Sequence, residues 1–378
     1  MPKFIHTADW QIGRQFSTFD DEDAHPLAEA RLQAVQRLAA LAVTHQVDAV
    51  LVAGDVFDLQ TVSDRTIRKL FNAMAGFTGA WVLISGNHDA ALVESVWTRA
   101  QRLGVVPSNV TLALQPEPVL LHEVRLAVLP APLTQRHTYG DTTAWFDLAD
   151  TPVNYVRVGL AHGSVQGILA DDIDSANPIA PDRATRARLD YLALGDWHGC
   201  KRIDDRTWYS GTPEPDRFKA NDSGRALLVD VAAPGSVPVV TVLDTAQFRW
   251  HQIDVALQVS TDLDELQARL SQLESDAVVD LRVQGQTTLM QHQQLAQTLG
   301  ETSARVRHLR ADVSALHLAP SEDELASLQA DGYLADILAE LREEQSHSGE
   351  AGEAARDALA LLGSALIQRA PAPEGGAA

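Results

Sequence analysis

The chain has 378 residues, with 51 acidic and 30 basic side chains and a formal net charge of −21. This length predicts two or three domains, and a hydrophobic share of 45% suits a globular protein. No run of about 18 uncharged apolar residues occurs, so we expect no transmembrane helix and no membrane partner. The first residues lack the apolar segment of a secretory signal, and the single cysteine, Cys200, excludes an intramolecular disulfide framework. We therefore expect a cytoplasmic protein.

The acidic charge argues against a free-standing nucleic-acid binder, because such proteins are usually basic. The charge is uneven along the chain, however. Residues 321–378 carry 12 acidic and 3 basic side chains, whereas residues 1–250 have a net charge of only −8. The composition therefore weakens nucleic-acid binding as a hypothesis without excluding it.

The first 250 residues predict a layered α/β fold, since apolar runs typical of buried strands alternate with segments of helical spacing. Expected strands are residues 2–8, 48–53, 81–84, 110–114, 118–122, 124–129, 156–161, 191–194, 207–210, 225–231 and 238–243. Expected helices are residues 29–45, 62–76 and 91–103. We expect these elements to form one domain, residues 1–250, with two sheets packed face to face and helices outside.

The pattern changes near Trp250. Strands are expected at 255–259, 278–283, 305–309 and 314–318, and helices at 262–274 and 288–300, which together predict a small α+β domain over 251–320. A capping-box pattern at Ser321–Glu324 begins a helical region that we place at 321–369. Its leucine stripes, 334–341 and 359–366, suit an intramolecular core or a partner-docking surface about equally. The Pro/Gly/Ala-rich residues 370–378 predict a disordered tail.

Five short polar motifs follow predicted strands. They are Asp9-Trp-Gln11, Gly54-Asp-Val-Phe-Asp58, Gly86-Asn-His-Asp89, Ala161-His-Gly163 and Gly195-Asp-Trp-His198. Ligands of α/β sheets gather beyond the carboxyl ends of strands, and since Asp, Asn and His are poor strand formers, their repeated placement at strand ends asks for a reason. Carboxylates and imidazoles without thiolates favour Mn²⁺, Fe²⁺ or Mg²⁺ over structural zinc. The motifs therefore predict a two-metal site, in which the carboxylate of Asp55 bridges both ions.

The order of these five motifs resembles that of the calcineurin-like metallophosphoesterase superfamily. Residues His6–Gly13 further resemble the first motif of the nuclease subunit (SbcD type) of bacterial SbcCD DNA-repair complexes. The resemblance implies an α/β fold, a two-sheet sandwich flanked by helices. It also implies a small α+β cap domain and a helical C-terminal arm that docks on an ATPase partner.

The resemblance also implies roles for individual residues. Two divalent ions, with Mn²⁺ expected and Mg²⁺ or Fe²⁺ as alternatives, would be held by Asp9, Gln11 and His198 (first ion), by Asn87, His162 and Asp196 (second ion) and by Asp55 (both ions). His88 would protonate the leaving oxygen or steady the scissile phosphate, and Asp89 could orient His88. The family usually has histidine at the positions of Gln11 and Asp196. For Gln11, a role as a spacer or hydrogen-bond donor is nearly as well supported as a role as a metal ligand.

The function implied is that of a metal-dependent DNA phosphodiesterase, exonuclease-like, acting as the nuclease subunit of a DNA-repair complex. Its partners would be DNA, an SMC-like coiled-coil ATPase and a second copy of the chain. Candidate contacts to the DNA backbone are Arg14, Arg65, Arg136 and Arg217, although surface arginines are often merely solvated.

Two alternatives stay open. The first is a phosphatase or small-molecule phosphodiesterase on the same fold. Protein phosphatases of the superfamily usually have Asp-Arg-Gly where this chain has Asp58-Leu-Gln60, which counts against that branch. The second is a catalytically weakened scaffold subunit. The replacements at Gln11 and Asp196 suggest this alternative, whereas the retention of the other motif residues counts against it.

Overall fold

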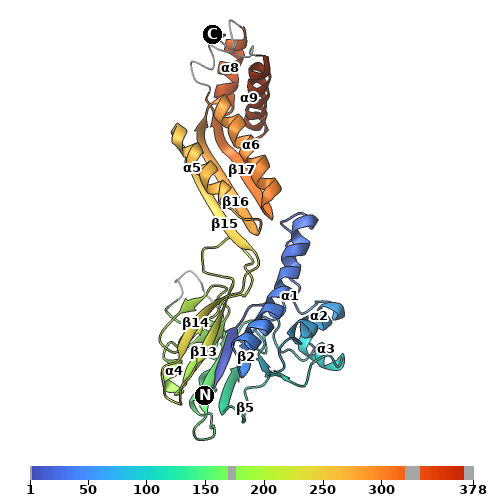
Figure 1. Cartoon of the computed structure of the whole chain (residues 1–378), viewed down its shortest axis with the longest axis vertical. Coiled ribbons are helices and arrows are strands. Elements are labelled where there is room, and N and C mark those ends of the chain that lie inside the picture. Colours follow the sequence, from blue (N-terminus) through green and yellow to red (C-terminus); the bar gives the residue numbers. More distant parts are fainter. Residues whose placement is uncertain (1, 169–175, 320–332, 370–378) are drawn as a thin grey trace, which may run out of the picture. The chain divides into compact units, whose positions relative to one another are not determined.

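The computed structural model describes residues 2–168, 176–319 and 333–369, and the chain divides into two compact units, Met1–Phe248 and Arg249–Ala378 (Figure 1). The expected helix start at 321–324 and the expected tail at 370–378 lie outside the described residues. Among the helices that are described, none combines the length and hydrophobicity that crossing a bilayer requires.

The first unit contains two six-stranded sheets. One sheet has the strand order β14-β13-β1-β2-β3-β4 and consists of β1 (Lys3–Thr7), β2 (Ala49–Val52), β3 (Ala80–Leu83), β4 (Val110–Leu112), β13 (Arg225–Asp230) and β14 (Val239–Asp244). The other has the order β11-β12-β10-β7-β6-β5 and consists of β5 (Val119–Leu121), β6 (Leu126–Ala131), β7 (Val156–His162), β10 (Tyr191–Gly195), β11 (Lys201–Arg202) and β12 (Thr207–Tyr209). The strands β1 to β4 run parallel, as do β6, β7, β10 and β12.

The two sheets pack face to face, which confirms the predicted sandwich. Side chains of both sheets share one buried cluster, to which Phe4 of β1 and Val158 of β7 belong. The next residue of β1, Ile5, lies in a second cluster with apolar residues of α1 (Asp21–Thr44), α2 (Asp64–Met74) and α3 (Val96–Arg102), because successive strand side chains point to opposite faces. The first sheet is therefore covered on both faces.

Some elements differ from the prediction. Helix α1 begins at Asp21, eight positions before the expected start, because its first turn is acidic rather than apolar and suits the positive end of the helix dipole. The short elements β8 (Ser164–Val165), β9 (Pro178–Ile179), β11, η1 (Ala144–Asp147) and α4 (Arg183–Arg186) were not predicted, since two to four residues carry no measurable period.

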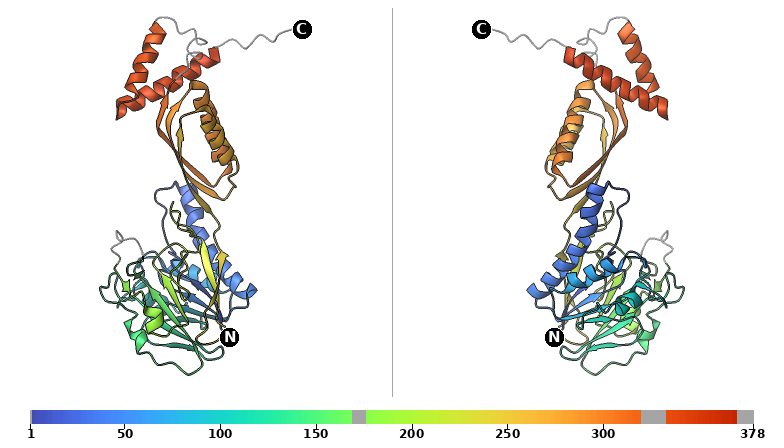
Figure 2. Two further views of the ribbon diagram at one scale, coloured as in Figure 1. Left: turned by 90° about the vertical axis from the view of Figure 1, so that its left-hand side faces the viewer. Right: turned by 90° about the vertical axis from the view of Figure 1, so that its right-hand side faces the viewer.

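The second unit is built on a three-stranded parallel sheet. Its strands are β15 (Arg249–Leu257), β16 (Ala277–Thr287) and β17 (His308–Leu318), joined by α5 (Ser260–Ser271) and α6 (Leu289–Arg305), which lie on one face of the sheet (Figure 2). The prediction of two strands at 305–309 and 314–318 is wrong. They are one strand, whose pairing with β16 shifts register between Arg282 and Gln284.

Two further helices, α8 (Tyr333–Glu344) and α9 (Glu350–Arg369), complete this unit. Leu338 of α8 and Leu359 of α9 are buried against Leu289 and Leu318. These two leucines of the predicted stripes therefore serve an intramolecular core. The side chains of the stripe residues 334 and 366 lie outside the described part of the chain.

Candidate metal centre

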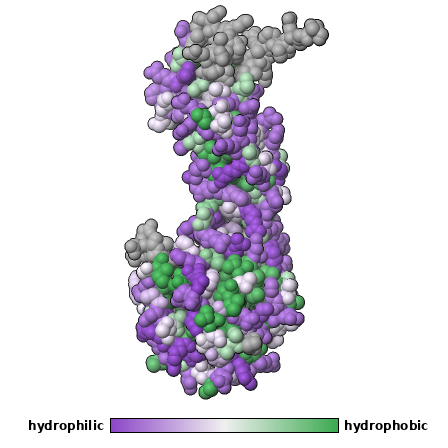
Figure 3. Space-filling model, turned by 60° about the vertical axis from the view of Figure 1, so that its left-hand side comes forward, coloured by the Kyte–Doolittle hydropathy of each residue, from purple (hydrophilic) through white to green (hydrophobic). Residues whose placement is uncertain are grey.

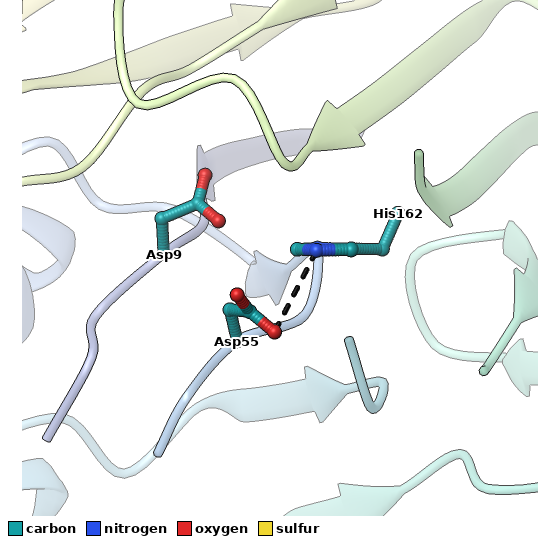
Figure 4. Close-up of side chains that lie close together, drawn as sticks. All are labelled: Asp9, Asp55 and His162. Carbon is teal, nitrogen blue, oxygen red and sulfur yellow. Dashed lines mark ion pairs between the residues drawn. The ribbon is translucent and has the colours of Figure 1, made fainter. Parts of the chain in front are cut away.

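The five motifs converge at the carboxyl ends of β1, β2, β3, β7 and β10. Asp9, Asp55 and His162 point toward one another (Figure 4), and each offers a ligand atom within 4.8 Å of the other two. All three side chains are buried. Because they come from three strands of two different sheets, only the sandwich fold brings them together.

The loops that carry these ligands have strained backbones. Asp9, Gln11 and Asp55 adopt φ values of 54°, 49° and 51°, in the left-handed region that costs about 1 kcal/mol or more for a residue with a side chain. Hydrogen bonds from Asp9 N to Gly54 O and from Gln11 N to Asp55 O, both 3.0 Å, hold the two loops together. Gly54 has a φ of 88°, and a Cβ there would lie 2.5 Å from Nδ1 of His162. Strain of this kind, fixed by neighbouring structure, is typical of functional loops.

His162 faces a cluster of oxygen atoms. Its Nδ1–H donates to the carbonyl of Ala53 at 2.8 Å, which leaves Nε2 as the free ligand atom. Nε2 lies 3.3 Å from Asn87 Oδ1, 3.6 Å from Asp55 Oδ1 and 3.7 Å from Asp196 Oδ1. Burial alone would lower the pKa of His162, but the surrounding carboxylates, Asp55 foremost, raise it to about 9.

The carboxylates are crowded. Burial raises the pKa of Asp9 to about 6, and the nearby charges of Asp55 and Asp196 add to this shift against the opposing effect of the histidines. Burial likewise raises the pKa of Asp196. Like charges this close resist joint ionisation unless a cation neutralises them.

Gln11 supplies an oxygen without a partner. Its Nε2 donates to Asp55 Oδ2 at 2.8 Å, whereas its buried Oε1 accepts no hydrogen bond from any described residue. A buried acceptor left unsatisfied is rare in proteins, and a bound cation would satisfy this one. Together with the crowded carboxylates and the free His162 Nε2, this atom makes the donor set fit a divalent ion of the Mn²⁺ or Mg²⁺ type.

His198 is oriented by Asp216, a residue that the sequence analysis did not assign. Nδ1 of His198 lies 3.0 Å from Asp216 Oδ2, so that its Nε2 is free for a ligand. Burial would raise the pKa of Asp216, but hydrogen bonds from His198 and Arg217 hold that pKa well below its usual range. The local signal for this role is weak, because an aspartate between a proline and an arginine is common in loops.

His88 lies at the rim of the centre. Its backbone N–H donates to Asp55 Oδ1 at 2.9 Å, and its Nδ1 lies 2.8 Å from the carbonyl of Asp58. Its Nε2 lies 4.0 Å from Asp55 Oδ2, and 30% of the side chain is exposed. The ring can therefore reach both the centre and a bound substrate.

The side chain of Asp89, which could orient His88 by the resemblance, makes its hydrogen bonds within the described residues to backbone groups instead. Its buried carboxylate accepts three backbone N–H groups, from Gly86 at 2.6 Å, Val56 at 2.8 Å and Phe57 at 3.1 Å. Burial raises the pKa of Asp89 to about 7 despite these hydrogen bonds. The residue ties the second motif loop to the third, which is a positioning role.

The four predicted DNA-binding arginines occupy different surroundings. Arg14 and Arg217 lie beside the centre, but both pair with Asp216, at 3.5 and 3.0 Å. Arg65 on α2 and Arg136 in the loop after β6 are exposed. Within the described residues, neither side chain makes a hydrogen bond or ion pair with a motif residue.

A buried arginine supports the backbone of the first motif. Arg31 of α1 is 1% exposed, and its guanidinium donates to the carbonyls of Asp9 at 3.0 Å, Trp10 at 2.7 Å and Glu214 at 3.0 Å, and to Thr212 Oγ1 at 2.9 Å. This role of Arg31 was not predicted from the sequence. The available signal was an arginine directly before Leu32, at the start of the apolar stripe of the predicted helix.

Comparison with known proteins agrees with this geometry. The calcineurin-like phosphoesterase family model matches residues 2–196. The chain belongs to this family, and it is a metal-dependent hydrolase of phosphodiester bonds.

Proteins similar to this chain include subunits of the SbcCD nuclease. The chain is 40% identical over 289 residues to the SbcD component of the SbcCD nuclease from Rhodobacter capsulatus, a match that covers 63% of this chain and 69% of that protein. It is 38% identical over 98 residues to the SbcD component of the same nuclease from Escherichia coli, covering 25% of this chain and 23% of that one. It is 24% identical over 284 residues to the DNA double-strand break repair protein Mre11 of Aeropyrum pernix, covering 68% and 64%. The predicted resemblance to SbcD-type subunits is confirmed.

Proposed function

We infer that this chain is a two-metal-dependent DNA phosphodiesterase, exonuclease-like in action, that serves as the nuclease subunit of a DNA-repair complex with an SMC-like ATPase. The observation that carries this proposal is the buried cluster of Asp9, Asp55 and His162 in a chain similar to a nuclease subunit and to a DNA double-strand break repair protein. Phosphodiester hydrolysis by such enzymes needs a charged ligand cluster of this kind.

The position of Asp55 supports two ions rather than one. Its Oδ1 faces Nε2 of His162 at 3.6 Å, and its Oδ2 accepts from Gln11 at 2.8 Å. The two oxygens of one carboxylate thus face two different ligand sets, as a bridging ligand requires. The first set would be Asp9, Gln11 and His198, and the second Asn87, His162 and Asp196. The oxygen and imidazole donors favour Mn²⁺.

Divalent ions bound there would neutralise the phosphate charge and activate a water molecule for in-line attack. Residues of the chain orient the histidine side chains of the centre. The carbonyl of Asp58 accepts a hydrogen bond from Nδ1–H of His88, which fixes the ring and leaves Nε2 toward the centre; as an imidazolium, the ring would donate its Nε2 proton to the leaving oxygen. Asp216 fixes His198 in the same way, through Nδ1. His88 is thus the acid, and Asp216 and Asp89 are positioning residues.

The partners follow from the relatives. The names of two relatives describe one component of a two-part nuclease and a DNA double-strand break repair protein. We propose DNA as the substrate and an SMC-like ATPase as the partner. The ATPase would contribute DNA affinity that a chain of net charge −21 lacks. A homodimer stays a prediction from the resemblance.

The test is hydrolysis of end-labelled single- and double-stranded DNA with Mn²⁺, by the wild-type chain and by His88→Ala and Asp55→Asn. We expect wild-type turnover that chelation abolishes. Each variant should lose at least about 100-fold in turnover while keeping its melting temperature, because one loses the proton donor and the other the bridge. Turnover that persists in both variants, or without metal, would refute the assigned mechanism.

A further inference from the structure

We propose that Lys201 and Lys219, held over the ring of Trp197, form a phosphate-binding subsite for the DNA strand beside the metal centre. The inference rests on the proposed DNA phosphodiesterase function and adds to it the residues that hold the strand. It also replaces the predicted arginines Arg14 and Arg217 as the main backbone contacts of this region.

The chain has few lysines, and half of them lie over the ring of Trp197. The chain has four lysines, Lys3, Lys69, Lys201 and Lys219. The Nζ atom of Lys219 lies 4.5 Å from the Trp197 ring centroid, and that of Lys201 lies 5.7 Å from it. The negative face of an indole attracts ammonium groups at such distances.

This ring lies next to the metal centre. Trp197 stands between the predicted ligands Asp196 and His198 in the sequence. Lys219 follows Arg217 by two residues, and Nη2 of Arg217 lies 2.9 Å from Nδ1 of His198. The loop that carries Lys219 therefore borders the centre.

The charges of the two lysines are not neutralised by carboxylates. Over the ranges 2–168, 176–319 and 333–369, neither ammonium group has an ion-pair partner, whereas Lys69 pairs with Glu29 at 3.0 Å. Arg14 and Arg217 both form ion pairs with the buried carboxylate of Asp216, which partly neutralises their positive charge. An aromatic ring positions a cation without removing its net charge.

A phosphodiester backbone is the ligand that this arrangement fits. Lysine is a compact point charge with three donors and binds phosphate without demanding one orientation. Two such charges on one side of a phosphodiesterase centre suit consecutive phosphates of a strand. The Trp197 ring is partly buried, and the two lysine side chains lie against it. We therefore assign it the role of positioning the ammonium groups, not of stacking on a base.

The experiment measures DNA binding as a function of salt. A fluorescein-labelled single-stranded oligonucleotide is titrated with Mn²⁺-loaded His88→Ala protein, in which the DNA stays intact, and Kd is read from fluorescence anisotropy between about 50 and 200 mM salt. Lys201→Gln, Lys219→Gln and the double variant are compared on this background. Lys69→Gln is the matched control, because it removes a lysine of the same unit that already has a partner.

We expect each substitution at Lys201 or Lys219 to raise the Kd roughly tenfold at low salt and to reduce the slope of log Kd against log salt by about 0.7. The control should change neither quantity, and melting temperatures should agree within a few degrees. Unchanged Kd and slope in the double variant, with the parent protein binding DNA, would overturn this inference alone. An equal effect of Lys69→Gln would also overturn it. A parent protein that does not bind DNA would also overturn this inference, whereas the proposed function, which assigns part of the DNA affinity to the ATPase, is tested separately by the hydrolysis assay.

Discussion

Arg31 shows how single side chains hold this centre in place. Its guanidinium reaches two carbonyls of the first motif and two groups of the loop that precedes Asp216. Burial lowers its pKa, and the nearby charge of Asp216 opposes this effect. The side chain thus links α1, the strained backbone of Asp9 and the loop that orients His198.

Replacing Arg31 with methionine should weaken both folding and metal binding. The substitution leaves buried carbonyls without donors, which we expect to cost roughly 3 kcal/mol or more of unfolding free energy. The Asp9 loop loses its support, so Mn²⁺ affinity should fall at least about tenfold. Denaturant unfolding and Mn²⁺ titration measure the two effects. Arg99→Met, at a partly exposed arginine of α3, is the control, and an Arg31→Met protein with the affinity of the control would contradict the account.

His6 predicts a loss of stability in acid. The residue is buried in β1 and bonds to Tyr191 Oη at 3.0 Å and the Leu194 carbonyl at 3.1 Å. Burial lowers its pKa to about 3, so it stays neutral in the fold while the unfolded chain takes up a proton below about pH 6.5. The unfolded state is therefore favoured as the pH falls, and at about pH 5 the cost is roughly 2 kcal/mol.

Urea unfolding of the metal-free protein at about pH 8 and about pH 5 tests this prediction. The wild-type chain should lose roughly 2 kcal/mol more between these values than His6→Asn does. His137→Asn, at an exposed histidine, should behave like the wild type. Equal losses in wild type and His6→Asn would show that His6 is not the group responsible.

Local pattern predicted the motif residues of the centre but not the residues that support them. Asp9, Asp55, Asn87, His162 and Asp196 each follow an apolar run in a recognisable motif, and the fold brings them together. Arg31, Asp216 and the actual contacts of Asp89 depend on chain segments far apart in sequence. Nothing in their own neighbours indicates those contacts, so a single sequence could not give them.

At the scale of elements, Gln345 anchors the C-terminal helices. Its side chain is buried just beyond α8, accepts from Leu318 N at 3.0 Å and donates to Leu318 O at 2.8 Å. It therefore extends the last residue of β17 with a pair of hydrogen bonds, as another strand would. Leu338 and Leu359 pack on the same Leu318.

Removing this anchor should loosen α8 and α9 locally. In Gln345→Ala both backbone groups of Leu318 lose their partner, at a cost of about 1–3 kcal/mol. Amide hydrogen exchange of α8 and α9 should rise about tenfold or more, and exchange in the first unit should stay the same. Gln297→Ala, which removes an exposed hydrogen bond to Glu301, is the control. Unchanged exchange in α8 and α9 would show that the leucines alone hold them.

Long elements with a clear period were predicted well, and their ends were not. Each of the eleven strands expected before residue 250 is present, and most of them are buried parallel strands, which read as continuous apolar runs. The strand β17 was divided in two because exposed residues such as Asp312 interrupt its apolar pattern. Exposure depends on the neighbouring strands, which a sequence does not display.

At the scale of the whole molecule, chemistry and charge are distributed unevenly. All five motifs belong to the first unit, whereas the most acidic segment, residues 321–378, belongs to the second. On the face shown in Figure 3, hydrophilic residues cover most of the second unit, and apolar residues gather in patches on the first. The catalytic role that we propose is therefore assigned to the first unit.

Anomalous diffraction from crystals loaded with Mn²⁺ would show directly whether the centre binds two ions. We expect two anomalous peaks about 3.5–4 Å apart, one on each side of the Asp55 carboxylate, with Gln11 Oε1 directed at one and His162 Nε2 at the other. In Asp55→Asn crystals, both peaks should weaken together, because the bridge is lost. A single peak, or peaks away from Asp55, would contradict the two-metal centre proposed here.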